Sequence, residues 1–198
     1  VAGEKIHKNP EDHNSWAILG LCFRELGDLN QAFSSLKIAT QLQPDQLTLH
    51  ISLAAISLEL GNVEQAQLSS DRVLLEQPDS DAALLVRAGI AKANGDLKSY
   101  AADLIEAQKK NPENPDVCRE FADYKLQSGQ FNEAYEFCLV YKHVLLSSSK
   151  GAHIFGEVAR HMGRLAEAKE HFQIALDLDP TNDKAAHNLG TLYFHLFD

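Results

Sequence analysis

The sequence predicts an all-α fold built from tandem helix pairs, and three columns of residues at one period predict it. Glycines recur every 34 residues, at Gly27, Gly61, Gly95, Gly129 and Gly163. Prolines keep the same step, with Leu146 in the one missing place, at Pro10, Pro44, Pro78, Pro112 and Pro180. Small residues do likewise at Gly20, Ala54, Ala88, Ala122, Gly156 and Gly190. Three columns that share one period indicate repeated structural units.

Each unit reads as two helices joined at the glycine. In the first unit, Trp16, Leu19 and Phe23 have helical spacing before Gly27. Asp28 follows, and its side chain can cap the second helix. The small column indicates where two helices cross closely, because a larger side chain there would hold the backbones apart.

The proline of each unit ends the second helix, because proline lacks an amide hydrogen and disfavours helical geometry in the residue before it. The fourth unit departs from this pattern. It has Leu146 in place of proline, and serines follow at 147–149. Serine clusters favour turns, so we expect a turn or a looser connection at 145–151.

These residues resemble the tetratricopeptide repeat family. The first unit carries the pattern at Trp16, Leu19, Gly20, Phe23, Gly27, Ala32, Leu36, Ala39 and Pro44. The resemblance implies a right-handed superhelix, an α-solenoid, whose first helices line a concave groove. The chain then forms a single array over 1–198, with the end of a preceding unit at 1–12, full repeats at 13–46, 47–80, 81–114, 115–148 and 149–182, and a last helix at 183–198.

One residue departs from the family pattern at a position that is expected to lie in the core. Arg87 lies where this family usually has Leu, and an unpaired guanidinium in a core is costly. We therefore expect Arg87 to extend outward or to pair with Asp103 or Glu106.

Composition excludes several classes of function. The 198 residues carry a net charge of -10, so the chain as a whole repels nucleic acid and anionic membrane surfaces. The three cysteines, Cys22, Cys118 and Cys138, follow no metal-ligand spacing, and we interpret them as buried thiols in a reducing compartment, the cytoplasm.

The sequence has no recognisable catalytic motif: it lacks a phosphate-binding glycine loop, a zinc-protease motif and a nucleophile elbow. We expect neither an enzyme nor a bound cofactor. His153, Glu157 and His187 could hold zinc if their atoms converged, but a solvated polar groove is the interpretation we favour. The side chain of His195 shares a repeat position with that of His161.

The groove is the predicted functional site. If the family geometry holds, its lining is apolar in the first three units and charged in the later ones. The predicted peptide-binding residues are Leu21, Arg24, Ile51, Ala55, Leu58, Leu85, Arg119, Asp123, His153, Glu157, Arg160 and His187. The Lys/Asn clamp with which chaperone-binding members hold a C-terminal carboxylate is not matched in this sequence.

The leading functional hypothesis is a non-catalytic scaffold that binds a segment of a partner protein in this groove, with apolar anchors at Leu21, Ile51 and Leu58. The alternative is a module of a larger enzyme or assembly complex. It is motivated by a chain that begins inside a second helix and ends without a polar cap, so that we expect the native chain to continue. A third hypothesis is self-association through the uncapped ends.

Overall fold

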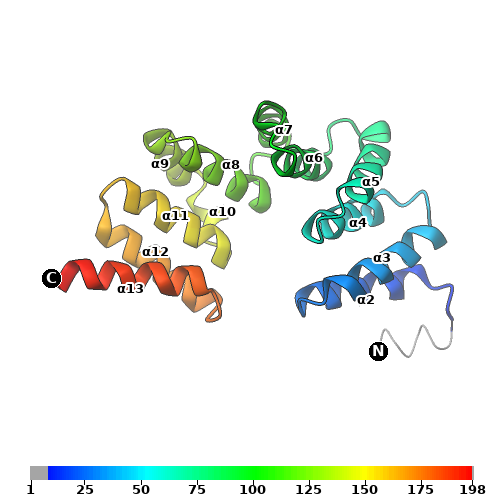
Figure 1. Cartoon of the computed structure of the whole chain (residues 1–198), viewed down its shortest axis with the longest axis horizontal. Coiled ribbons are helices and arrows are strands. Elements are labelled where there is room, and N and C mark those ends of the chain that lie inside the picture. Colours follow the sequence, from blue (N-terminus) through cyan, green and yellow to red (C-terminus); the bar gives the residue numbers. More distant parts are fainter. Residues whose placement is uncertain (1–8, 198) are drawn as a thin grey trace. The chain divides into compact units, whose positions relative to one another are not determined.

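The computed structural model describes residues 9–197, with side chains described up to Phe194. This range contains twelve helices and no β-strand (Figure 1). The helices are α2 (His13–Glu25), α3 (Leu29–Leu42), α4 (Leu47–Glu59), α5 (Val63–Glu76), α6 (Asp81–Ala93), α7 (Leu97–Lys110), α8 (Pro115–Gln127), α9 (Phe131–Val140), α10 (Lys142–Leu145), α11 (Ser149–His161), α12 (Leu165–Leu178) and α13 (Asp183–Phe197). The predicted all-α helical-repeat class is confirmed.

The chain divides into two compact units, Val1–Lys110 and Asn111–Asp198, which are described separately below. In the first unit, α2 packs on α3, α4 on α5, and α6 on α7; α4 also contacts α6. In the second unit, α11 packs on both α8 and α12, and α12 packs on α13. The preceding half-repeat predicted at 1–12 lies largely outside the described residues, and the division into one array of five complete repeats stays a prediction.

The turns follow the predicted chemistry. All five periodic glycines have φ between 70° and 79°, a left-handed conformation in which other residues are strained, and each follows a first helix. Asp28 Oδ1 then accepts the amide hydrogen of Gln31 at 3.1 Å and caps α3. Asn62 does the same for Gln65 and caps α5. Sequence therefore determines both sides of this turn.

The small column lies at close helix crossings. Ala54, Ala88 and Ala122 are completely buried. A methyl group on Gly20 would come within 2.7 Å of Leu36 Cγ, and one on Gly156 within 2.5 Å of the Phe172 ring. These contacts explain why the column admits only small residues.

Arg87 pairs with Asp103, as expected. Its Nε and Nη2 atoms donate to the two carboxylate oxygens of Asp103 at 2.8 and 2.6 Å. The guanidinium extends outward, and the paired carboxylate raises its pKa. Asp103 is the more buried partner, so the bidentate contact compensates its desolvation.

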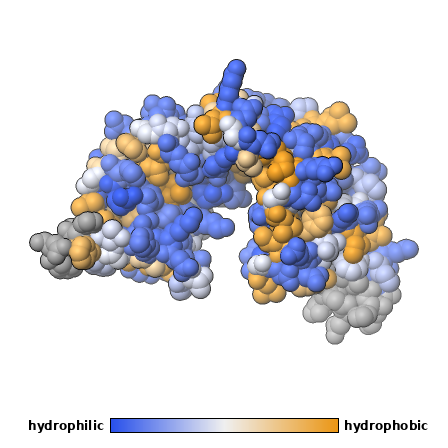
Figure 2. Space-filling model, in the orientation of Figure 1, coloured by the Kyte–Doolittle hydropathy of each residue, from blue (hydrophilic) through white to orange (hydrophobic). Residues whose placement is uncertain are grey.

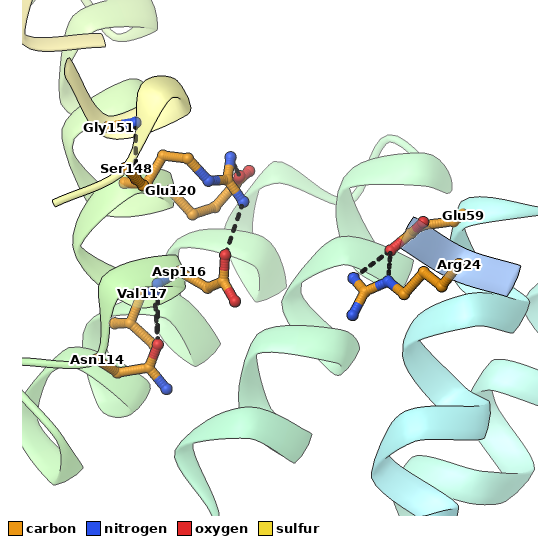
Figure 3. Close-up of polar contacts among 9 residues, drawn as sticks. Arg24, Glu59, Asn114, Asp116, Val117, Glu120, Ser148 and Gly151 are labelled. Atoms are coloured by element: carbon orange, nitrogen blue, oxygen red, sulfur yellow. Dashed lines mark hydrogen bonds and ion pairs between the residues drawn. The ribbon is translucent and has the colours of Figure 1, made fainter. Parts of the chain in front are cut away.

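The connection at 145–151 forms a turn at residues 146 and 147, as one of the two predicted alternatives, and because it is packed, the looser alternative is wrong. The second helix of this repeat breaks at Tyr141, between α9 and α10, and the short α10 buries Leu145. A side chain on Gly151 would collide with the Leu145 carbonyl, so the backbones touch here. Two of the serines form hydrogen bonds: the Ser148 hydroxyl accepts from the Gly151 amide and caps α11 (Figure 3). The Ser149 hydroxyl donates to the Ala175 carbonyl at 2.7 Å.

One of the cysteine predictions is also wrong. Cys118 and Cys138 are buried thiols, but Cys22 is exposed, because it is not among the residues that α2 buries, which are Ser15 and Gly20. None of the described helices is both long enough and apolar enough to cross a bilayer.

Candidate protein-binding faces

In the first unit, the predicted groove residues belong to α2, α4 and α6. Figure 2 shows hydrophobic residues over these helices. Leu21 is 45% exposed on α2, and Ile18 on the same helix is 52% exposed. Ile51 and Leu85 are half-buried. Ile51 also lines a shallow pocket of about 670 Å³ at 77–82, where the chain enters α6.

Leu58 and Ala55 belong to the packing of this unit as well as to its surface. Both are half-buried against the core formed by α4, α5 and α6, which includes Ala54, Ala66, Val86 and Ile90. A methyl group on Gly89 would collide with Leu58, so these two residues mark the contact between α4 and α6. Leu58 is therefore less suited to a partner's side chain than exposed Leu21.

Arg24 is held by an ion pair within the first unit. Its Nε and Nη2 atoms donate to Glu59 Oε1 at 3.1 and 2.5 Å (Figure 3). Both side chains are about 40% exposed, at 41% and 39%, so solvent screens the pair. The contact connects α2 to the end of α4.

In the second unit, the predicted residues meet in one open pocket of about 1060 Å³. Helices α8, α11 and α13 supply Arg119, Asp123, His153, Glu157 and His187. Of the later predicted residues, Arg160 alone is not in the lining, but its Nη2 donates to Glu157 Oε2 at 2.8 Å. The walls are partly apolar, formed by Leu126, Phe131 and Ile154.

A polar network joins α11 to α13 at this pocket. The Asn188 amide donates to His153 Nε2 at 3.0 Å and to Glu157 Oε1. Burial lowers the pKa of His153 despite the opposing Glu157 carboxylate, which keeps the ring neutral and Nε2 able to accept. The other carboxylate oxygen of Glu157, Oε2, forms an ion pair with the Arg160 guanidinium. Hydrogen bonds and an ion pair among these side chains therefore fix the pocket wall formed by α11 and α13.

Several pocket residues were missed from the sequence. His161 stacks on Phe131 with ring centres 4.9 Å apart, and Asn188 makes the contacts just described. Lys150 and Lys184 also line the pocket. These two lysines share the second position of successive repeats, a periodic signal that could have identified them.

Two of the three predicted candidate metal ligands, His153 and Glu157, form hydrogen bonds within the protein. Within residues 9–194, no three His, Cys, Asp or Glu side chains converge as metal ligands. His153 and Glu157 both accept hydrogen bonds from Asn188. The side chain of His195 lies outside the described residues.

Comparison with known proteins agrees with this architecture. One curated relative is the N-alpha-acetyltransferase 16, NatA auxiliary subunit, of Mus musculus, which is 23% identical over 188 residues. The match covers 89% of this chain, and the chain spans about a fifth (21%) of that relative's length.

Two solved structures share the fold. TTC0263 of Thermus thermophilus, a thermophilic TPR protein, has a TM-score of 0.76 at 18% identity, over 92% of this chain and 99% of its own. The APC/C hetero-tetramer Cut9-Hcn1 has a TM-score of 0.83 at 12% identity, over 98% of this chain and 39% of its own.

Models of the tetratricopeptide repeat match residues 23–90 and 152–182. The same repeat was derived above from the glycine, proline and small-residue columns. The chain belongs to the tetratricopeptide repeat family, and its fold is that of a protein-interaction scaffold.

Proposed function

We propose that this chain is a non-catalytic scaffold that binds a segment of a partner protein through the exposed faces of its first helices. The observation that carries the proposal is the pocket of the second unit, where three first helices bring polar and apolar side chains together around an open volume. Peptide segments bind such helical surfaces by placing apolar side chains in recesses while polar groups set the register.

The apolar face of the first unit supports the same role. Ile18 and Leu21 lie one turn apart on α2, and both stay about half exposed. Exposed apolar patches on folded proteins mark interaction sites. Leu21 is the anchor on which the first unit's part in binding depends.

Affinity capture from cells of the source organism tests the proposal. Wild-type chain is compared with His187→Glu in the pocket and with Leu21→Glu on α2. Matched controls place the same charge on exposed residues of second helices, at Ala166 and Leu75. We expect a protein retained by the wild type and by both controls to be lost with at least one of the two face variants. Equal retention by all five chains would overturn the proposal.

A second candidate role is as a module of a larger enzyme or assembly complex. It is favoured by the match to the NatA auxiliary subunit, which spans 89% of this chain but 21% of that relative. Sequencing the native transcript on both sides of these codons tests this role. A reading frame that continues into a further domain supports it, and a frame limited to this array contradicts it.

A further inference from the structure

We propose that His153, Glu157 and Asn188 form a proton-controlled latch, which holds α13 against α11 while the His153 ring is neutral and releases the pocket-facing side of α13 when the ring takes up a proton. As a device that regulates binding at the pocket, the latch rests on the proposed function. It is carried by one side-chain amide group that is shared between a carboxylate and an imidazole.

The Glu157 carboxylate determines which way the Asn188 amide points. The same Nδ2 atom of Asn188 contacts Glu157 Oε1 and His153 Nε2. A carboxylate that forms an ion pair with Arg160 only accepts hydrogen bonds, so the group that faces it must be the NH₂ donor and not the amide oxygen. His153 Nε2 is then left with the role of acceptor. The ring must therefore be neutral, with its proton on Nδ1.

Protonation of His153 reverses the role of Nε2. When a proton from solvent binds this atom, both ring nitrogens become donors, and neither can accept from Asn188. A carboxylate is available one turn later on the same helix, because Glu157 lies at i+4. The protonated ring can take the oxygen that Asn188 contacts in the neutral state. One proton thus removes both contacts of Asn188 with α11.

The charged groups around His153 set the direction of this change. Burial lowers the pKa of His153 below the ordinary 6.5, and Lys184 on α13 adds to this effect. Glu157 on α11 and Asp123 on α8 oppose it. From α12, the Phe172 ring faces the imidazole with ring centres 5.8 Å apart. The protonated ring is therefore attracted to α8 and to its own helix and repelled by α13. The other titratable groups of the pocket lining are Arg119, Lys150, His161, Asp179, Asp183 and His187.

The rest of α13 is attached independently of the latch. Leu189 and Leu192 are buried in a core that they share with residues of α11 and α12. Before the first turn of α13, the Asn182 amide donates to the Ser149 hydroxyl at 2.8 Å. Loss of the Asn188 contacts therefore changes the pocket wall but leaves α13 in the unit. The closed latch is present above the lowered pKa of His153 and opens as the pH falls through it.

Nuclear magnetic resonance of the whole chain, with isotope-labelled side chains, tests the latch without a partner. At about pH 7.5 we expect the His153 proton on Nδ1, as read from correlations between the ring nitrogens and the carbon-bound ring hydrogens. The Asn188 side-chain amide signal should move with the same midpoint as the His153 ring when the pH is lowered to about 5. A proton on Nε2 at about pH 7.5, or an Asn188 signal that ignores the titration of His153, would overturn the latch.

Two asparagine variants separate the latch from burial alone. Asn188→Ala removes the donor to the neutral ring and frees Glu157 for the protonated ring, so the pKa of His153 should rise by about 0.5 or more. Asn182→Ala is the matched control, because it removes the other asparagine contact between α13 and α11. It should change the pKa of His153 by less than about 0.2. Equal changes in both variants would assign the effect to the attachment of α13 in general and overturn the latch.

His153→Gln keeps an acceptor oxygen for Asn188 but cannot take up a proton. In this variant the Asn188 amide signal should stay constant between about pH 7.5 and about pH 5. A change as large as that of the wild type would contradict the role of His153. His171→Leu is the second control, because it removes the other buried histidine of this unit and should leave the Asn188 titration unchanged.

The capture experiment then connects the latch to binding. A partner that the wild type retains through the pocket should be retained less at about pH 5.5 than at about pH 7.5. With His153→Gln, the ratio of retention at the two pH values should be close to one, whatever its level. The same fall with pH in this variant would reject regulation by the latch. If no partner is captured at either pH, the proposed function fails, whereas the His153 and Asn188 signals still decide the latch.

Discussion

The candidate binding faces of the two units use equivalent first helices, but different contacts hold those helices together. In the first unit, apolar contact between Leu58 and Gly89 sets the α4–α6 distance, and the charged contact between Arg24 and Glu59 is exposed. In the second unit, Asn188 joins α11 to α13 through His153 and Glu157. One repeat geometry therefore supports an adaptable apolar surface in one unit and a defined polar pocket in the other.

The largest predicted difference between the units concerns two glycines. Gly151→Ala should destabilise the second unit by about 3 kcal/mol, because the added methyl collides with the Leu145 backbone carbonyl, which cannot move without disrupting the α10–α11 packing. Gly89→Ala should cost less than about 1 kcal/mol, because the end of the Leu58 side chain can turn aside and alanine favours helix.

Urea unfolding followed by circular dichroism, with hydrogen exchange to assign the change to a unit, measures this pair of variants. Gly190→Ala is the internal control, because no atom lies within 4 Å of its added methyl. Equal losses of stability for Gly89→Ala and Gly151→Ala would remove the contrast between side-chain and backbone contact.

Thiol reactivity should differ by at least about 100-fold between the units. Cys22 in the first unit is exposed, whereas burial raises the pKa of Cys118 to about 11 and that of Cys138 to about 12. Since the thiolate is the reactive species, iodoacetamide at about pH 8 should modify Cys22 first. Peptide mass spectrometry over a time course measures the three rates, and comparable rates in native protein would contradict the burial of the α8–α9 core.

Acidification should destabilise the second unit selectively. Burial lowers the pKa of His171 and His153 below the ordinary 6.5, an effect that Lys142 and Lys184 reinforce and Glu170 and Glu157 oppose. As the pH falls, these histidines are therefore protonated in the unfolded chain before they are protonated in the folded chain. The free energy of unfolding is then independent of these two groups well above pH 6.5 and decreases as the pH drops below 6.5. The slope is at most about 1.4 kcal/mol per pH unit for each histidine.

Amide hydrogen exchange at about pH 7.5 and about pH 5.5 tests this pH dependence of stability, once the measured rates are corrected for intrinsic exchange rates. We expect protection to fall in α11–α13 and to persist in α3–α6, where no described histidine is buried. His171→Leu, which removes a ring nitrogen that has no partner, should reduce the pH dependence. An unchanged dependence in that variant would assign the effect to other groups.

The smallest effect is expected at Arg24. Arg24→Ala should change the stability of the first unit by no more than about 0.5 kcal/mol, because the ion pair with Glu59 is exposed and screened. Thermal unfolding at low and high salt checks this value. A loss above about 1 kcal/mol would show that this polar contact holds α2 and α4 together, and the contrast between the units would then weaken.

Much of the fold could be predicted from local sequence. Turn glycines and capping side chains at Asp28 and Asn62 act within a few residues, so their effect is readable without a tertiary structure. The Arg87–Asp103 pair was predictable because an arginine in a core position must find an acid. At 145–151 the predicted turn is present, but the looser alternative is wrong, because the serine cluster gives no sign of the Gly151–Leu145 contact.

The candidate site was only partly predictable. Repeat positions indicated which side chains of α8, α11 and α13 share a surface, but not that Arg160 is absent from the pocket lining or that Asn188 bridges two helices. Sequence by itself determined the period, the turns and the helix faces, because backbone conformation and helical spacing are local. Tertiary structure decided which charges pair with one another, because pairing depends on how neighbouring helices approach.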